Sequence, residues 1–135
     1  MNKRAQFAAT MEALLDERMD VTVLLGDIGV HSFRHAFGKH PSRCINIGIC
    51  EGASVSLAAG LSASGLYPVF STIESFLLRR AFEQLFLDFG IQKLPGLFVG
   101  IGGANEYAKL GPTHQCEHGL RLAREIPGMQ IYQPA

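Results

Sequence analysis

The feature of this sequence that most constrains its fold is a continuous run of aliphatic and β-branched residues, Val21 to Leu25, which stops abruptly at Gly26-Asp27. A run without polar alternation is typical of a strand that is buried on both faces. Such strands belong to parallel sheets, because the helical crossovers between parallel strands cover both faces of the sheet. The run therefore predicts an α/β domain built on a parallel sheet.

The rest of the chain repeats this alternation of helix and strand. Apolar residues at helical spacing predict a first helix over residues 3–18. Further strands are expected at 44–47, 67–71, 97–101 and 129–132, and further helices at about 51–64, 75–89 and 117–125. This order predicts a three-layer parallel-sheet domain with right-handed crossovers, in which ligands bind beyond the carboxyl ends of the strands.

The composition limits both the size and the partners of this domain. The 135 residues are 47% hydrophobic, enough to bury one core, so we expect a single domain over residues 1–135. Twelve basic and twelve acidic residues leave no net charge, which argues against nucleic acid or an anionic membrane as a partner. No apolar run approaches the ~20 residues of a membrane span, and the first residues do not resemble a signal peptide. We therefore expect a cytoplasmic protein.

The cysteines and histidines do not predict a metal site. Cys44, Cys50 and Cys116 are odd in number and lack the paired C-x-x-C spacing of structural zinc, so neither disulfides nor zinc are expected. His31 and His35 are spaced like a pair of metal ligands on a helix, but no third ligand accompanies them. We expect these two and His40 to be surface residues.

Glu51 is a candidate site residue because it lies at a strand-to-helix junction between two apolar segments. One interpretation is an acid in the first turn that complements the helix dipole. The other is a carboxyl group in an apolar setting, which can exchange a proton with a ligand nitrogen. The residues alone leave both open.

A second candidate is His114, in the loop Gly111-Pro-Thr-His-Gln115. The Gly-Pro pair forces a turn and delivers a hydroxyl, an imidazole and an amide together at the start of a predicted helix. Thr113 can equally be a helix cap and His114 a solvated loop residue.

Several short motifs occur in an order that is more specific than any one of them. In chain order they span Gly26-Asp27, Arg43–Glu51, Ala58–Val69, Ser75-Phe76, Arg80–Gln84, Gly111–Gln115, Ile126–Met129 and Gln133–Ala135. Over residues 24–135 this set resembles the pyrimidine-binding domain of the transketolase family, which includes 1-deoxyxylulose-5-phosphate synthase. The resemblance implies the fold of a thiamine diphosphate pyrimidine-binding domain and an enzyme that uses this cofactor.

The resemblance also implies roles for four residues. Glu51 matches the glutamate that hydrogen-bonds the aminopyrimidine ring, where a carboxyl group in a dry pocket can share a proton with ring atom N1′. Phe76 matches the aromatic residue that packs on this ring, and Asp27 matches an acidic residue near the thiazolium. His114 matches the histidine that reaches the sugar substrate. We therefore expect Glu51 and His114 to be catalytic, and Glu51, Phe76 and Asp27 to bind the cofactor.

The other half of such a cofactor site has no counterpart in the sequence. No Gly-Asp-Gly motif followed at a distance by Asn occurs in the chain. The resemblance therefore implies that a diphosphate-binding partner subunit holds Mg²⁺, in a split enzyme that assembles as a heterotetramer and in which this chain also self-associates. Family domains usually continue through another helix and strand, and the sequence leaves open whether the domain is complete at Ala135.

The resemblance leaves three functions to distinguish. The leading one is transfer of a two-carbon ketol unit from a ketose to an aldehyde, which the Gly-Pro-Thr-His and Ile-Pro-Gly-Met motifs favour. The alternatives are a relative that uses a 2-oxoacid, similar to deoxyxylulose-phosphate synthase or the beta subunit of pyruvate dehydrogenase, and a non-catalytic assembly module. Retention of Glu51, Phe76 and His114 together argues against the module. Leu110 stands where family enzymes acting on sugar phosphates often have Asp, so phosphorylation of the substrate stays open.

Overall fold

The buried run found in the sequence forms a central strand of a four-stranded parallel sheet. The structure is a computed structural model that describes residues 3–103 and 106–134. The strand order is β2-β1-β3-β4, and every neighbouring pair is parallel. The strands are β1 (Val21–Leu25), β2 (Cys44–Asn46), β3 (Tyr67–Ile73) and β4 (Leu97–Ile101). The expected parallel α/β sheet is confirmed.

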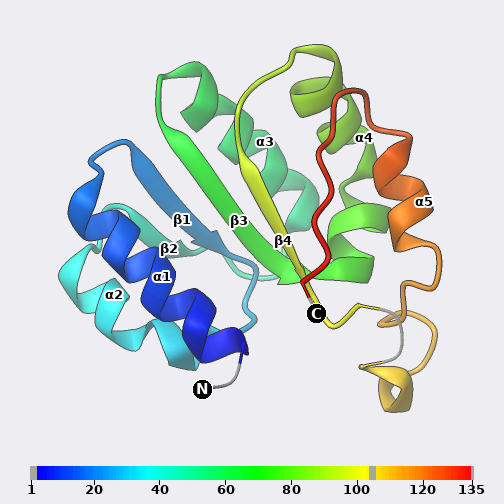
Figure 1. Cartoon of the computed structure of the whole chain (residues 1–135), viewed down its shortest axis with the longest axis horizontal. Coiled ribbons are helices and arrows are strands. Elements are labelled where there is room, and N and C mark those ends of the chain that lie inside the picture. The colour runs from blue at the N-terminus through cyan, green and yellow to red at the C-terminus, as the bar shows by residue number, and fades with distance from the viewer. Residues whose placement is uncertain (1–2, 104–105, 135) are drawn as a thin grey trace.

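Helices cover both faces of this sheet (Figure 1). On one face lie α1 (Lys3–Glu17), η1 (Val30–Phe33) and α2 (Arg34–Lys39). On the other face lie α3 (Glu51–Ala63), η2 (Phe76–Arg80), α4 (Phe82–Gln84), η3 (Leu85–Ile91) and α5 (Gly119–Arg124), while η4 (Ala108–Leu110) belongs to the loop after β4. No helix in the described part of the chain is both long and apolar enough to cross a membrane.

Alternate residues of the strands enter two separate cores, which explains why the apolar run is continuous. Val23 and Leu25 of β1 pack with α1, η1 and α2. Leu24 of β1 and Phe70 of β3 pack with α3 and the helical segments that follow β3. All four side chains are fully buried, so both layers of helices are fixed to the same strands.

The strand predicted at 129–132 is wrong. Residues 129–134 form no regular structure, and Ile131 and Tyr132 are exposed. A strand needs a neighbouring strand whose backbone N–H and C=O groups form hydrogen bonds with its own. Within the described residues this segment forms no ladder with β4, so its β-branched and aromatic composition alone does not make a strand.

The helix predicted at 75–89 is present but is not one regular α-helix. The segments η2 and η3 have π-helical turns, and Ala81 between η2 and α4 departs from helical geometry (φ −113°, ψ 19°). Turns of this kind are rare and often occur at functional sites. The irregular stretch begins at Phe76, one of the predicted site residues.

Candidate active site

The side chains singled out from the sequence gather at the carboxyl edge of the sheet. Gly26 follows β1 and packs against Thr72 near the end of β3, so closely that a Cβ atom at Gly26 would lie 2.7 Å from Thr72 Oγ1. Only glycine allows this approach. Ligands of open α/β sheets bind at this edge, as expected from the order of elements.

Glu51 is the first residue of α3 and is almost fully buried, with 3% of its surface exposed. The Thr72 hydroxyl donates to Oε1 at 3.5 Å, and Nη1 of Arg80 donates to Oε2 at 3.3 Å. A carboxylate removed from water needs such partners, and the N-terminus of α3 adds positive potential. The carboxyl group is therefore held away from water, with Arg80 as the one cation that pairs with it among the described residues.

Arg80 links Glu51 to Phe76. Its Cζ atom lies 3.6 Å from the centroid of the Phe76 ring, a close cation–π contact. The two residues are four positions apart on a helical segment, a spacing that brings side chains together. The His114 ring meets the same phenyl ring in a T-shaped arrangement, with centroids 4.9 Å apart. The structure thus brings three of the four predicted site residues into one cluster around Arg80.

The loop that carries His114 is anchored to the segment after β3. The Ser75 hydroxyl donates to the carbonyl oxygen of Thr113 at 2.9 Å, and Arg79 Nη1 donates to that of Pro112 at 3.3 Å. Within the loop, the Thr113 hydroxyl lies 2.9 Å from Nδ1 of His114. These contacts hold the imidazole in place against the phenyl ring.

Asp27 lies at the same edge but outside this cluster. Its backbone is left-handed (φ 59°), a conformation that Asp tolerates better than most residues. The side chain of Asn46, at the end of β2, accepts from the Asp27 N–H at 3.1 Å and donates to Asp27 Oδ1 at 2.9 Å. Among the described residues, no hydrogen bond or ion pair joins Asp27 to Glu51 or His114. Its carboxylate is exposed and held in a fixed orientation.

A second acid, Glu74, lies beside the cluster and is half-buried. Burial raises its pKa above the ordinary value of 4.5. Two glycines lie close to it, since a Cβ atom at Gly103 or at Gly119 would force the carboxylate to shift. Burial, followed by the charge of Glu74, also raises the pKa of the Cys116 thiol. A thiol with a raised pKa is a poor nucleophile, so Cys116 is not a candidate for covalent chemistry.

The histidines near α2 connect the two helices on the other face of the sheet. His35 Nδ1 lies 2.5 Å from a carboxylate oxygen of Glu12, and His40 Nε2 lies 2.7 Å from one of Asp16. Lys39 also pairs with Asp16, and this hydrogen bond is the main cause that lowers the pKa of that carboxyl group. Within the described ranges, no group of three or more His, Cys, Asp and Glu side chains could hold a metal ion.

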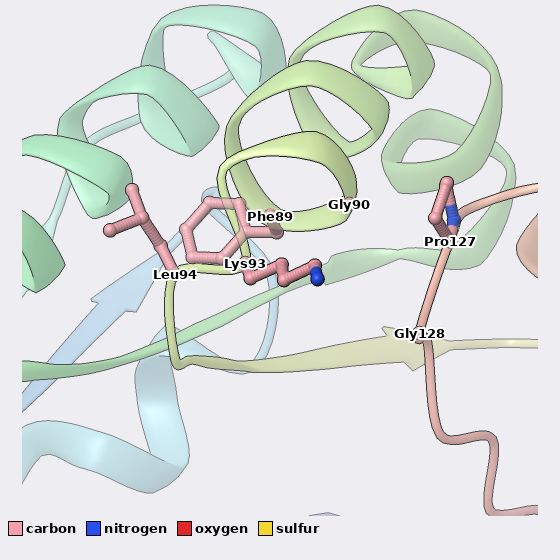
Figure 2. A pocket seen from close by; sticks show the side chains of 6 residues that line it. All are labelled: Phe89, Gly90, Lys93, Leu94, Pro127 and Gly128. Atoms are coloured by element: carbon pink, nitrogen blue, oxygen red, sulfur yellow. The ribbon is translucent and has the colours of Figure 1, made fainter.

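An apolar pocket of about 320 Å³ lies at the opposite, amino edge of the sheet (Figure 2). Its wall contains a single ionisable side chain, and the lining residues are Phe89, Gly90, Lys93, Leu94, Pro127 and Gly128. Because acid–base chemistry needs titratable groups that converge, the carboxyl edge and not this pocket is the candidate site.

Three residues of the carboxyl edge were not assigned roles from the sequence. Arg80 stood inside a quoted motif, and its spacing of four from Phe76 on a predicted helix was a usable signal. Thr72 and Asn46 gave no such signal. Their contacts depend on the order of the strands in the sheet, which the sequence does not specify.

Comparison with known proteins agrees with this geometry. The family model described as "Transketolase, pyrimidine binding domain" matches residues 1–135. The chain belongs to this family. The resemblance seen in the sequence is therefore confirmed, and membership of the transketolase family implies dependence on thiamine diphosphate.

Two curated relatives of this pyrimidine-binding domain cover nearly all of it. It is 33% identical over 132 residues to 1-deoxy-D-xylulose-5-phosphate synthase of Pseudarthrobacter chlorophenolicus, which covers 95% of this chain and 19% of that protein. It is 30% identical over 128 residues to an "Uncharacterized 33.6 kDa protein in fasciation locus" of Rhodococcoides fascians, which covers 95% of this chain and 41% of that protein. The chain spans less than half the length of both.

Solved structures show the same fold. A structure described as "Split gene transketolase, inactive beta4 tetramer" is 30% identical, with a TM-score of 0.77 over 92% of this chain and 40% of that chain. Transketolase from Campylobacter jejuni, at 21% identity, has a TM-score of 0.75 over 92% of this chain and 20% of that chain. The three-layer fold expected from the sequence is thus confirmed.

Proposed function

We propose that this pyrimidine-binding domain is one subunit of a split, thiamine diphosphate-dependent, transketolase-like enzyme that transfers a two-carbon ketol unit from a ketose to an aldehyde. The observation that carries the proposal is the buried Glu51 carboxyl group at the carboxyl edge, linked through Arg80 to the Phe76 ring. The similarity to a split-gene transketolase supports a separate partner subunit.

The residues present fit the pyrimidine end of the cofactor. The planar guanidinium of Arg80 lies between the Phe76 ring and the Glu51 carboxylate, so this place accepts a flat group that carries N–H donors. The aminopyrimidine is such a group, and aromatic stacking together with a buried hydrogen-bond acceptor would recognise it. The sequence carries no Gly-Asp-Gly motif, so we assign Mg²⁺ and the diphosphate to the partner.

Each predicted site residue then has a distinct task. When bound, thiamine diphosphate supplies an electron sink for cleavage of a bond next to a carbonyl group. Glu51 holds a proton at ring nitrogen N1′, because a carboxyl group buried beside the ring can hydrogen-bond that atom. Phe76 orients the ring, and His114 beside it stabilises negative charge that develops on the substrate oxygen. Asp27 supplies a counter-charge to the thiazolium.

The proposed assembly contains two copies of each subunit. The outward face of α3 supports contact with another chain, because it combines small residues with an exposed Leu57 (44%). The small residues of this face are Ala53, Ser56 and Gly60. Side chains of this size allow a partner helix to approach closely.

Co-expression with a transketolase-like polypeptide that carries the Gly-Asp-Gly motif tests this proposal. The complex should co-purify, bind thiamine diphosphate and Mg²⁺ in calorimetry, and transfer a ketol unit from a ketose donor. The chain alone should transfer no ketol unit and should bind neither Mg²⁺ nor thiamine diphosphate in the micromolar range. Micromolar binding of both cofactors by the chain alone would contradict the split enzyme.

The relatives favour a second candidate, an enzyme that uses a 2-oxoacid donor. Besides the synthase described above, 1-deoxy-D-xylulose-5-phosphate synthase of Prochlorococcus marinus is 43% identical over 98 residues, which is 70% of this chain and 14% of that protein. The donor would then be pyruvate, and CO₂ would be released. Release of CO₂ from pyruvate by the complex, without activity on ketoses, selects this candidate.

A further inference from the structure

The Phe76 ring has no free face on which a ligand could stack. Only 8% of the residue is exposed. Arg80 lies at van der Waals distance from the ring centre, and His114 packs against it in a T-shaped contact. A stacked cofactor ring needs the same space of about 3.5 Å above an aromatic face. Something must therefore move before the cofactor can pack there.

The group that covers Phe76 shares its chemistry with the expected ligand. A guanidinium is planar and delocalised, and it carries N–H donors at its edge. In this structure its Cζ atom lies over the Phe76 ring, 3.6 Å from the ring centroid, while its Nη1 donates to Oε2 of Glu51. A 4-aminopyrimidine in the proposed site would contact the same two groups, the Phe76 ring through its face and the Glu51 carboxyl group through its edge, where N1′ would accept a proton from Glu51.

We propose that Arg80 occupies the pyrimidine subsite as an intramolecular stand-in for the cofactor ring, and that it swings outward when the cofactor binds. This inference rests on the proposed function of the site. Arg80 is then a gating residue, and Glu51 exchanges a fixed cation for a ring nitrogen with which it can share a proton.

The surroundings of Arg80 permit this movement. Its side chain is 47% exposed, so the guanidinium can rotate into water without crossing packed residues. Glu51 keeps the Thr72 hydroxyl as a partner when Arg80 leaves. The backbone next to Arg80 is already irregular at Ala81, so the segment has no regular helical turn to lose.

The stand-in lowers the apparent affinity for the cofactor. A ligand that binds only the open form has an apparent affinity equal to its intrinsic affinity multiplied by the fraction of molecules that are open. A cation–π contact and an ion pair of ordinary strength at a half-exposed site correspond to a reduction of about fivefold to thirtyfold.

Nuclear magnetic resonance titration of the full chain tests the stand-in. The probe is 4-amino-5-hydroxymethyl-2-methylpyrimidine, which presents the ring without the diphosphate. The Arg80→Ala variant should bind it about fivefold to thirtyfold more tightly than the parent chain. The matched control is Arg34→Ala, which removes the same charge from an exposed position of α2, on the other face of the sheet. This control should bind the probe as the parent does.

The outcomes separate the stand-in from the proposed function. In the parent chain, the probe should shift the Arg80 Nε–H signal and contact the Phe76 ring protons. Arg80→Lys keeps the charge without the planar group and should bind with intermediate affinity, which guards against a folding defect of the alanine variant. Equal or weaker binding by Arg80→Ala overturns the stand-in alone. Binding by none of the folded variants overturns the pyrimidine site itself, and the stand-in with it.

Discussion

The two edges of the sheet differ in what they offer a ligand. The amino edge has an apolar hollow lined by Phe89 and Leu94, with a single ionisable group in its wall. The carboxyl edge holds a buried acid, an arginine and two aromatic rings, joined in a chain of contacts from Glu51 through Arg80 and Phe76 to His114. The pocket and the cluster of reactive side chains therefore lie at opposite edges of the sheet. Under the proposed function, the partner subunit would enclose the chemistry of the carboxyl edge.

The largest loss of activity at the carboxyl edge is expected for Glu51→Gln. The amide is nearly isosteric but cannot give a carboxylic proton to a ring nitrogen, so exchange of the cofactor's C2 proton in the assembled enzyme should fall by ~10²–10⁴-fold. Proton exchange followed by nuclear magnetic resonance measures it. The control is Glu74→Gln, at the same edge, which should exchange normally. An unchanged rate in Glu51→Gln removes the proton role.

His114→Ala should separate two steps of the reaction. Because the imidazole lies against Phe76 and not against Glu51, C2 proton exchange should be normal. Cleavage of a ketose donor should slow by ~10²–10³-fold, the usual loss when a group that stabilises a developing oxyanion is removed. Single-turnover kinetics of the assembled enzyme distinguish the steps. A parallel fall in both rates contradicts the assignment.

Two equally buried phenylalanines, one at each edge, sharpen the comparison. Phe76 and Phe89 are both 8% exposed, but Phe89 packs against Phe98 at 4.6 Å whereas Phe76 packs against Arg80 and His114. Phe89→Ala should cost about 3 kcal/mol of unfolding free energy and leave cofactor affinity unchanged. Phe76→Ala should weaken thiamine diphosphate binding to the complex by ~1–3 kcal/mol and cost less stability.

Urea unfolding and calorimetric titration of both variants check this pair. Loss of stability without loss of affinity in Phe76→Ala would reassign that ring to the core. Loss of affinity in Phe89→Ala would show that the two edges are not independent.

The sequence predicted the parallel core because local patterns determine it. The run at 21–25 and the helix at 51–63 matched within a residue or two, since their apolar spacing fixes which faces are buried. The strand at 129–132 failed because pairing is not a local property. The short helix α2 was not predicted, since its six residues carry too little periodicity to be recognised.

The candidate site was predicted only in part for a similar reason. The motif order singled out Glu51, Phe76 and His114, and the structure brings them together. The sequence could not show that Arg80 lies on the Phe76 ring, because the π-helical turn that positions both residues has no clear sequence pattern. It also could not place Asp27 against Asn46, a contact that depends on β2 lying next to β1.

The smallest effect is expected for Glu74→Gln. This variant tests whether the charged Glu74 carboxylate lowers the free energy of unfolding. Burial raises the pKa of Glu74 above 4.5, so between 4.5 and that higher value the folded chain binds more protons than the unfolded chain. Stability therefore falls as the pH rises through this window, and the loss persists above it.

Glutamine, which stays neutral, should stabilise the chain at pH 7 by only a few tenths of a kcal/mol, about what remains for a half-exposed group after solvent screening. At a pH below about 4, the carboxyl group is mostly protonated in both the folded and the unfolded chain, so the gain should vanish. Urea unfolding at both pH values measures the difference. An equal gain at both would assign the effect to packing between Gly103 and Gly119, and a loss at pH 7 would mean that the carboxylate is stabilised in the folded chain.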